Sequence, residues 1–229
     1  MSLFIVNSSI GRKLIMSITG LALVLFLTFH AIMNLFVIIS PEVYDQICHF
    51  LGANWYAIVG TMGLAFLFVV HILYAFWLSL QNYLARGKDR YAVTKKAPGV
   101  DWASQNMLVL GIIVFGFLAL HLYNFWYKMQ LQEILGTTAV INGQSISPTD
   151  GAFLIRYTFS QWYYVLAYVV WLAALWFHLS HGFWSMFHSV GWSGSKWLGR
   201  WQVIGNIYVT LLVLGFLSVV LFYFFKSIF

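Results

Sequence analysis

The sequence contains very little charge. Only 8% of its 229 residues are Asp, Glu, Lys or Arg, whereas a soluble domain normally carries about 25%. So few charged side chains cannot cover a water-facing surface, which excludes an ordinary soluble globular domain. The hydrophobic fraction of 62% and the mean hydropathy of +0.83 indicate instead that most of the chain is surrounded by hydrocarbon.

Cysteine is almost absent as well. The single Cys48 excludes an intrachain disulfide, a multi-cysteine zinc or iron–sulfur site and a CxxCH motif for covalent haem. The N-terminal stretch MSLFIVNSSIGRKL lacks the charged start and the small-residue cleavage site of a signal peptide, and the apolar run after it is too long for one. We therefore expect that run to be retained as a membrane span.

Long apolar segments make up most of the sequence. A helix of about 20 apolar residues crosses the hydrocarbon core and satisfies its own backbone hydrogen bonds there. The expected spans cover residues 13–39, 55–84, 103–129, 158–187 and 202–225. The sequence thus predicts an all-α membrane protein, one bundle of five transmembrane helices over residues 1–229.

Basic residues are distributed unevenly between the two sides of this bundle. Nine of the twelve lie in the N-terminal segment and in the second and fourth loops, and three lie on the other side. Because loops rich in Lys and Arg stay in the cytoplasm, we expect a cytoplasmic N-terminus and a periplasmic C-terminus. Tryptophans near the expected helix ends are typical of an interfacial aromatic belt.

Four of the five spans carry a histidine well inside the apolar run: His30, His71, His121 and His178. One such histidine is readily explained as a polar contact between membrane helices. Four histidines on four helices, with almost no buried carboxylate or lysine to pair with, indicate a functional site instead.

The depths of these histidines sort them into two pairs. Counted from the periplasmic end of each expected helix, His30 and His121 lie 11 and 7 residues deep, and His71 and His178 lie 16 and 21 residues deep. Neutral imidazole is a good iron ligand. We therefore expect two b haems stacked at two depths. Glycines near these histidines fit either a macrocycle or close helix packing: Gly20, Gly60, Gly63, Gly111, Gly116 and Gly182.

The fourth span holds three histidines in the stretch ALWFHLSHGFWSMFHSVGW, residues 174–192. On a helix His181 lies about 60° and His188 about 80° from His178, so all three share one broad face. Depth excludes His188, which lies at the cytoplasmic edge. On these grounds His178 and His181 both remain candidates for the fourth ligand.

The sequence resembles the five-helix dihaem cytochrome b subunit of succinate:quinone oxidoreductases, a group that includes menaquinol:fumarate reductases. The matching elements are SITG at 17–20 followed by His30, the single His71 of the second span, HLY at 121–123 and HLSHGFWSMFHSVGW at 178–192. In that family the fourth-helix ligand is followed by glycine at +4, an aromatic residue near +6 and glycine at +13. Counting from His178 matches this pattern and counting from His181 does not. The resemblance thus favours His178 as ligand and His181 as a neighbouring hydrogen-bond donor.

The resemblance also implies the rest of the assembly. His30 and His121 would hold the distal haem, and His71 and His178 the proximal one. In a bacterial inner membrane, the cytoplasmic face would dock an iron–sulfur subunit bound to a flavoprotein that interconverts fumarate and succinate. Electrons would pass between menaquinone, or another quinone, and those partners. The dicarboxylate chemistry would belong to another subunit.

The first periplasmic loop offers three candidates for quinone chemistry, Glu42, Asp45 and His49. A quinone site needs a group that exchanges protons, and histidine titrates close to neutral pH. In part of the family an acidic residue just before the second helix serves quinol oxidation, and His49 lies near that place. Ordinary solvated loop polarity explains each residue alone equally well.

Haem propionates favour hydrogen-bond donors near helix ends. Candidates on the cytoplasmic side are Ser17, Trp102 and His188, and on the other side Lys128 and Arg156. For the basic residues, a role in membrane topology is a competing explanation.

Two other classes of protein compete with this interpretation. The dihaem membrane subunit of a nitrate reductase or hydrogenase generally places two ligand histidines on one helix, whereas here the candidates fall one per helix. A non-redox transporter predicts paired broken helices or a buried charge at mid-membrane, and the sequence suggests neither. Whether such a complex reduces fumarate or oxidises succinate depends on the quinone and haem potentials. Ligand identity alone does not set these potentials.

Overall fold

The computed structural model describes residues 8–85 and 102–229. Five of its helices are long and apolar enough to cross a membrane: Ile10–Ile39, Trp55–Ala85, Met107–Trp126, Trp162–Ser189 and Trp197–Ile228. Their outer surfaces expose many Leu, Ile, Val and Phe side chains, which hydrocarbon accommodates at no cost. The expected all-α architecture with five membrane helices is therefore confirmed.

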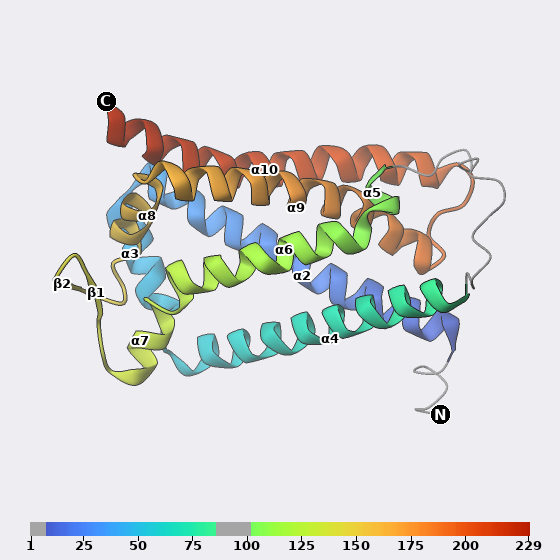
Figure 1. Cartoon of the computed structure of the whole chain (residues 1–229), viewed down its shortest axis with the longest axis horizontal. Helices are drawn as coiled ribbons and strands as arrows, with labels where there is room; N and C mark the ends of the chain where they lie inside the picture. Colours follow the sequence, from blue (N-terminus) through green and yellow to red (C-terminus); the bar gives the residue numbers. More distant parts are fainter. Residues whose placement is uncertain (1–7, 86–101) are drawn as a thin grey trace.

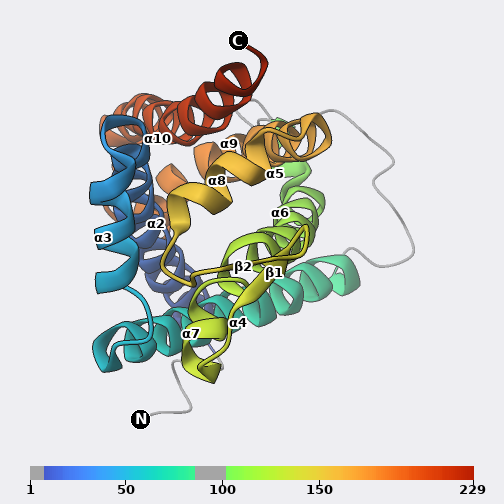
Figure 2. The ribbon, with the colours of Figure 1, turned by 90° about the vertical axis from the view of Figure 1, so that its left-hand side faces the viewer.

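The long helices run side by side along one axis (Figure 1). They are α2 (Ser9–Ile39), α4 (Trp55–Ala85), α6 (Met107–His121), α9 (Trp162–Ser189) and α10 (Trp197–Ile228). The best-packed core lies between α2, α9 and α10, where Val37 and Val209 are completely buried. α6 packs against α9, and α4 lies along α2 at the edge of the bundle (Figure 2).

Helix α4 combines packing along α2 with a few polar contacts. None of its side chains is buried between Trp55 and Ala85. Near one end, Arg12 Nη1 of α2 donates to Gln81 Oε1 over 2.5 Å. Near the other, Thr61 Oγ1 donates to Gln130 Oε1 over 2.9 Å. Because lipid is as apolar as the helix surface, hydrophobic burial contributes little to helix association in a membrane, and such contacts position α4.

Two expected spans have different boundaries in the structure. The segment 103–129 is divided into α5 (Trp102–Gln105), α6 and the π-helical turn η1 (Leu122–Trp126). In η1 the Tyr127 amide donates to the Leu122 carbonyl, five residues back. The segment 158–187 begins inside α8 (Gly151–Phe159), which extended Gln161 separates from α9. Apolar residues flank the breaks at η1 and at Gln161, so hydropathy does not reveal them.

The loops at the end opposite the N-terminus contain regular structure that the sequence predicted only as loops (Figure 2). Besides α8, they form α3 (Pro41–Phe50), α7 (Gln130–Leu135) and the antiparallel strands β1 (Ala139–Ile141) and β2 (Gln144–Ile146). The strands are joined through Asn142 and Gly143, both with positive φ, as a tight two-residue hairpin turn requires. These elements form a cap over one end of the bundle.

Helix α3 is anchored to α8 by two close contacts. Asp45 Oδ1 accepts a hydrogen bond from the Ala152 amide over 2.8 Å. Cys48 packs against Gly151, where an added Cβ would lie 2.5 Å from the Cys48 sulfur. Burial in this contact raises the pKa of the Cys48 thiol to about 12. Any larger residue at position 151 would force the two helices apart.

The described basic residues separate by bundle end. Arg12, Lys13, Lys196 and Arg200 lie at the end where α2 and α10 begin, and Lys128, Arg156 and Lys226 lie at the opposite end. The remaining basic residues of the expected cytoplasmic side fall in 86–96, outside the described residues. The orientation in the membrane stays a prediction based on this asymmetry.

Fusion of alkaline phosphatase tests the orientation, because this enzyme needs disulfides that form only outside the cytoplasm. We expect an active fusion after Gly143 in the hairpin and an inactive one after Ser195 between α9 and α10. A cytoplasmic fluorescent reporter at the same two positions should give the opposite pattern. The reverse activities at both positions would place the N-terminus outside.

Candidate functional site

The outer histidine pair lies between α2 and α6. His30 of α2 and His121, the last residue of α6, have ring centroids 5.8 Å apart and nearly perpendicular ring planes. Aromatic rings surround them: Phe26 stacks on His30 at 5.4 Å, and Trp171 of α9 lies 5.4 Å from His121. The structure therefore brings together the two shallow histidines in an apolar, aromatic environment.

This arrangement suits the two axial positions of one iron. Two imidazole nitrogens bound to a metal at about 2 Å each lie about 4 Å apart, with ring centroids about 6 Å apart. The 5.8 Å between His30 and His121 is close to that separation. Tyr168 Oη lies 3.5 Å from His121 Nδ1, so the polar group next to this imidazole is a neutral phenol.

The inner histidines are His71 of α4 and His178 of α9. His71 Nδ1 lies 3.1 Å from Thr19 Oγ1 of α2. The Thr19 hydroxyl donates its own proton to the Ile15 carbonyl over 2.8 Å. With its proton on that carbonyl, the Thr19 oxygen can accept from the Nδ1–H group of His71, and in that tautomer Nε2 of the ring is free to bind a metal.

Two glycines lie directly against the inner imidazoles. A Cβ on Gly20 of α2 would be 3.6 Å from His71 Cε1, and one on Gly111 of α6 would be 3.6 Å from His178 Cε1. Gly20 precedes His30 by ten residues, and Gly111 precedes His121 by ten residues. Both helices thus contact the outer and inner pairs at the same interval, about 15 Å along the helix axis.

The other glycines near the histidines differ in their surroundings. Within the described parts of the chain, a Cβ on Gly60, Gly63 or Gly116 would meet nothing within 4 Å, and one on Gly182 would lie 3.7 Å from Met107. Close helix packing therefore does not account for the first three positions, although it was the competing explanation for them.

The structure places His178 and His181 in different surroundings. His178 lies against Gly111, and its Nδ1 is buried with no hydrogen-bond partner among the described residues. Nδ1 of His181 is buried as well, so burial of this atom does not separate the two histidines. The ring of His181 packs edge-on against Trp184 of its own helix, with centroids 4.9 Å apart. Position therefore favours His178 as the inner ligand.

The propionate candidates lie at the helix ends, as expected. Two of them, Ser17 and His188, have hydrogen-bond partners close by in the sequence. Ser17 is buried and donates to the Lys13 carbonyl over 2.9 Å. His188 Nδ1 lies 2.6 Å from Ser193 Oγ in the turn after α9. Trp102 is exposed and its ring contacts Phe177. These contacts leave Trp102 as the candidate with the most accessible side chain at this end.

At the opposite end, Lys128 and Arg156 lie next to aromatic rings. Lys128 Nζ is 5.1 Å from the Tyr123 centroid, and Arg156 lies 5.7 Å from that of Phe153. Partial burial lowers the pKa of Lys128. Arg156 is exposed on α8. Lys128 follows η1 closely and is the nearer of the two along the chain to His121.

The three quinone candidates lie on α3 and face different partners. Glu42 is exposed, and hydrogen bonds from its own backbone and from Ser40 lower its pKa. Asp45 bridges α3 to α8, and burial raises its pKa. His49 is exposed near the end of the helix. The structure does not gather the three side chains around one hollow.

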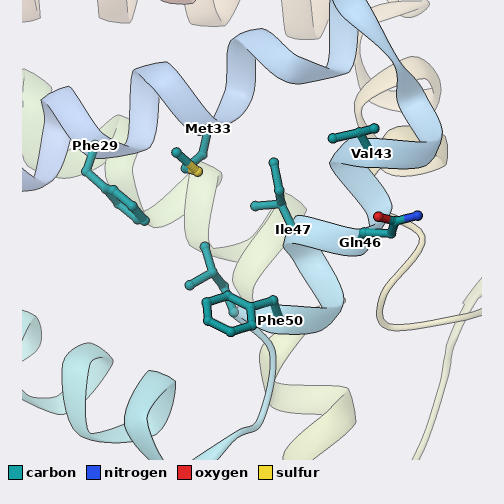
Figure 3. Close-up of a pocket in the computed structure, with 7 residues that line it drawn as sticks. Phe29, Met33, Val43, Gln46, Ile47 and Phe50 are labelled. Carbon is teal, nitrogen blue, oxygen red and sulfur yellow. The ribbon is translucent and has the colours of Figure 1, made fainter.

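A different face of α3 borders an apolar groove of about 260 Å³ against α2 (Figure 3). Its lining consists of Phe29, Met33, Val43, Gln46, Ile47, Phe50 and Leu51. Phe29 directly precedes His30 in α2, and neither His30 nor His121 belongs to the lining. Gln46 is the polar side chain in this lining and can both donate and accept a hydrogen bond.

Sequence reasoning missed three residues that the structure places at these sites. Thr19 was visible only as part of SITG, and no pattern indicated that it faces His71. Gln46 stands among apolar residues at helical spacing, a signal hidden because the segment was expected to be a loop. Glu133 of α7 packs against Gly52 just before α4, with Oε2 buried and without a hydrogen-bond partner among the described residues.

No family model, curated protein or solved structure matches the chain. Among the described residues, no group of three or more His, Cys, Asp or Glu side chains forms a multi-ligand metal site. The family resemblance therefore stays a prediction that rests on the motifs and on the two histidine pairs.

Proposed function

We propose that the chain is the membrane-anchor cytochrome b subunit of a succinate:quinone oxidoreductase in a bacterial cytoplasmic membrane. The observation that carries the proposal is the pair of histidine levels, built by α2 with α6 and by α4 with α9. The ordered motifs from SITG to HLSHGFWSMFHSVGW support the same family. A soluble iron–sulfur subunit and flavoprotein would dock at the end where α2 begins.

The residues present fit two b haems. His30 and His121 would hold the outer haem, and His71 and His178 the inner one. When bound, the haems would carry single electrons between membrane quinone and the partner subunits. Thr19 keeps the His71 proton on Nδ1, and the small side chains of Gly20 and Gly111 allow the helix backbones to approach the inner imidazoles.

The distribution of ligands also discriminates between the competing classes. Dihaem subunits of nitrate reductases or hydrogenases generally take two ligands from one helix, whereas α2, α4, α6 and α9 each contribute one candidate here. A transporter of the broken-helix type uses discontinuous helices in corresponding positions of its two halves. The π-helical turn of this chain lies at the end of a single helix, α6. A quinone-linked dihaem protein accounts for these features best.

We place the quinone ring in the groove between α2 and α3. The groove is apolar, which suits entry of a lipophilic substrate from the bilayer, and Gln46 can hydrogen-bond a quinone carbonyl (Figure 3). Phe29 and Met33 in its wall flank His30 along α2. Glu42 and His49 lie at exposed positions of α3, outside this groove.

Haem content is the first test of the proposal. We expect two haems b per polypeptide in the purified wild-type protein, measured by reduced-minus-oxidised difference spectra. His178→Ala should retain one, because it removes an axial ligand of the inner pair, and His181→Ala should retain both. A colourless wild-type protein would exclude the cytochrome. Loss of one haem in His181→Ala, with two kept in His178→Ala, would reassign the ligand.

Thr19→Val tests the contact that orients His71. The substitution keeps the side-chain shape and removes the acceptor for Nδ1–H, and loss of such a partner typically weakens metal binding about 10- to 100-fold. We expect a redox titration to show one of two midpoint potentials shifted, with easier loss of that haem. Thr28→Val is the matched control, since Thr28 contacts the Val24 carbonyl and the Tyr208 hydroxyl. Equal effects of both variants would argue against a specific role for Thr19.

Ile47→Trp tests the quinone groove, because the larger side chain fills it. We expect a reduced naphthoquinone to reduce the haems at least about tenfold more slowly, since lost contacts worth 1.4 kcal/mol suffice for that factor. Dithionite should still reduce the same amount of haem, and Ile47→Val should behave as wild type. An unchanged quinol-driven rate in Ile47→Trp would place the quinone elsewhere.

A further inference from the structure

A second hollow lies at the other end of the bundle, in the turn between α9 and α10. It measures about 370 Å³ and is lined by Gly191, Trp192, Gly194, Trp197 and Trp201. None of these residues belongs to the histidine pairs or to the groove on α3. The hollow therefore needs its own explanation.

Hydrogen bonds and ring stacking fix the walls of this hollow. α9 ends at Ser189 and is followed by Gly191 at φ +83°. The Trp192 amide donates to the Phe187 carbonyl over 3.0 Å, a turn that glycine in the left-handed region permits. Trp201 Nε1 donates to the Trp192 carbonyl over 2.9 Å. The Trp201 ring stacks on Phe187 with centroids 3.9 Å apart. The shape thus exists before any ligand arrives.

Among the described residues, the charged side chains next to the hollow in the sequence are basic. Lys196 caps the start of α10, and the Arg200 guanidinium lies 5.0 Å from the centre of the Trp197 ring. The N-terminus of α10 adds the positive end of its helix dipole, and its first turn contains no acidic residue. The sequence from residue 151 to residue 229 contains no Asp or Glu at all. The complementary ligand is therefore an anion.

The surface of α10 next to the hollow is apolar and exposed. Ile204, Ile207 and Leu211 lie on the same face of the helix as Arg200, within about 40° of it at 100° per residue. All three side chains are exposed. These three side chains form an apolar stripe that runs from Arg200 along α10 into the hydrocarbon region. Acyl chains can lie along this stripe.

We propose that the hollow binds the phosphate headgroup of an anionic phospholipid such as phosphatidylglycerol. Lys196 and Arg200 would pair with the phosphate, and basic residues at this level each favour anionic lipid. Trp192 and Trp197 are 67% and 48% exposed, and indole rings prefer the headgroup region. An acidic protein surface would match the charge, but it would not account for the apolar stripe that continues from Arg200 along α10.

Lipid binding is measured on the purified protein, with any subunits that co-purify, by native mass spectrometry. Phosphatidylglycerol and phosphatidylcholine with identical acyl chains serve as probes. We expect one tightly retained phosphatidylglycerol that phosphatidylcholine does not replace. In Lys196→Gln/Arg200→Gln its apparent Kd should rise about thirtyfold, as expected for two basic residues near a membrane surface.

Two further variants separate a built site from general charge attraction. Lys13→Gln/Lys226→Gln removes the same charge elsewhere and should leave the retained lipid unchanged. Gly194→Leu keeps all charges but fills the hollow, since an added Cβ there meets no neighbour within 4 Å among the described residues; it should abolish retention. Equal weakening by both charge variants, or full retention in Gly194→Leu, would overturn the proposal.

Two outcomes would assign the hollow to other ligands and also overturn the proposal. Displacement of the lipid by millimolar inorganic phosphate would identify a site for a free anion. Loss of a co-purifying subunit in Gly194→Leu, with no difference between the two lipids in the wild type, would identify a protein-docking surface. Haem content need not change in any of these variants, so this test is independent of the proposed electron transfer.

Discussion

The absence of water from the bilayer core is the constraint on which the structure depends. Each backbone and side-chain polar group in that region has to find its partner within the protein. This explains why the five spans are helical, and it explains why an imidazole at mid-membrane calls for a specific neighbour. His71 meets Thr19 and His121 lies beside Tyr168, whereas Nδ1 of His178 is one of several buried side-chain atoms without a hydrogen-bond partner among the described residues.

Helices α2 and α6 connect the outer and the inner histidine levels. Each contacts the outer level through a histidine and the inner level through a glycine ten residues earlier. Helix α4 contributes to the inner pair, whereas α9 carries His178 and also places Tyr168 and Trp171 next to His121. Within α2 and α6 the relation between the two levels is set by the 1.5 Å rise per residue of a helix, which is nearly invariant.

Much of this was predictable from the sequence, because hydropathy and histidine position follow directly from the membrane environment. The five spans, the four histidines and their sorting by depth required only residue counts. The breaks at η1 and Gln161 were not predictable, since apolar residues continue on both sides of each. α3 was missed because a ten-residue helix with a mixed polar surface has no hydropathy signal. No role could be assigned to Thr19 from the sequence, because its contact is with His71, 52 positions away.

The polar attachment of α4 has a consequence for assembly. Helices α9 and α10 share an extensive buried core, whereas α4 buries no side chain fully and adds hydrogen bonds of Gln81 and Thr61 to its packing along α2. In a bilayer the exposed flank of α4 is then covered by lipid at little cost. α4 is therefore the spanning helix whose place in the bundle depends least on a buried core.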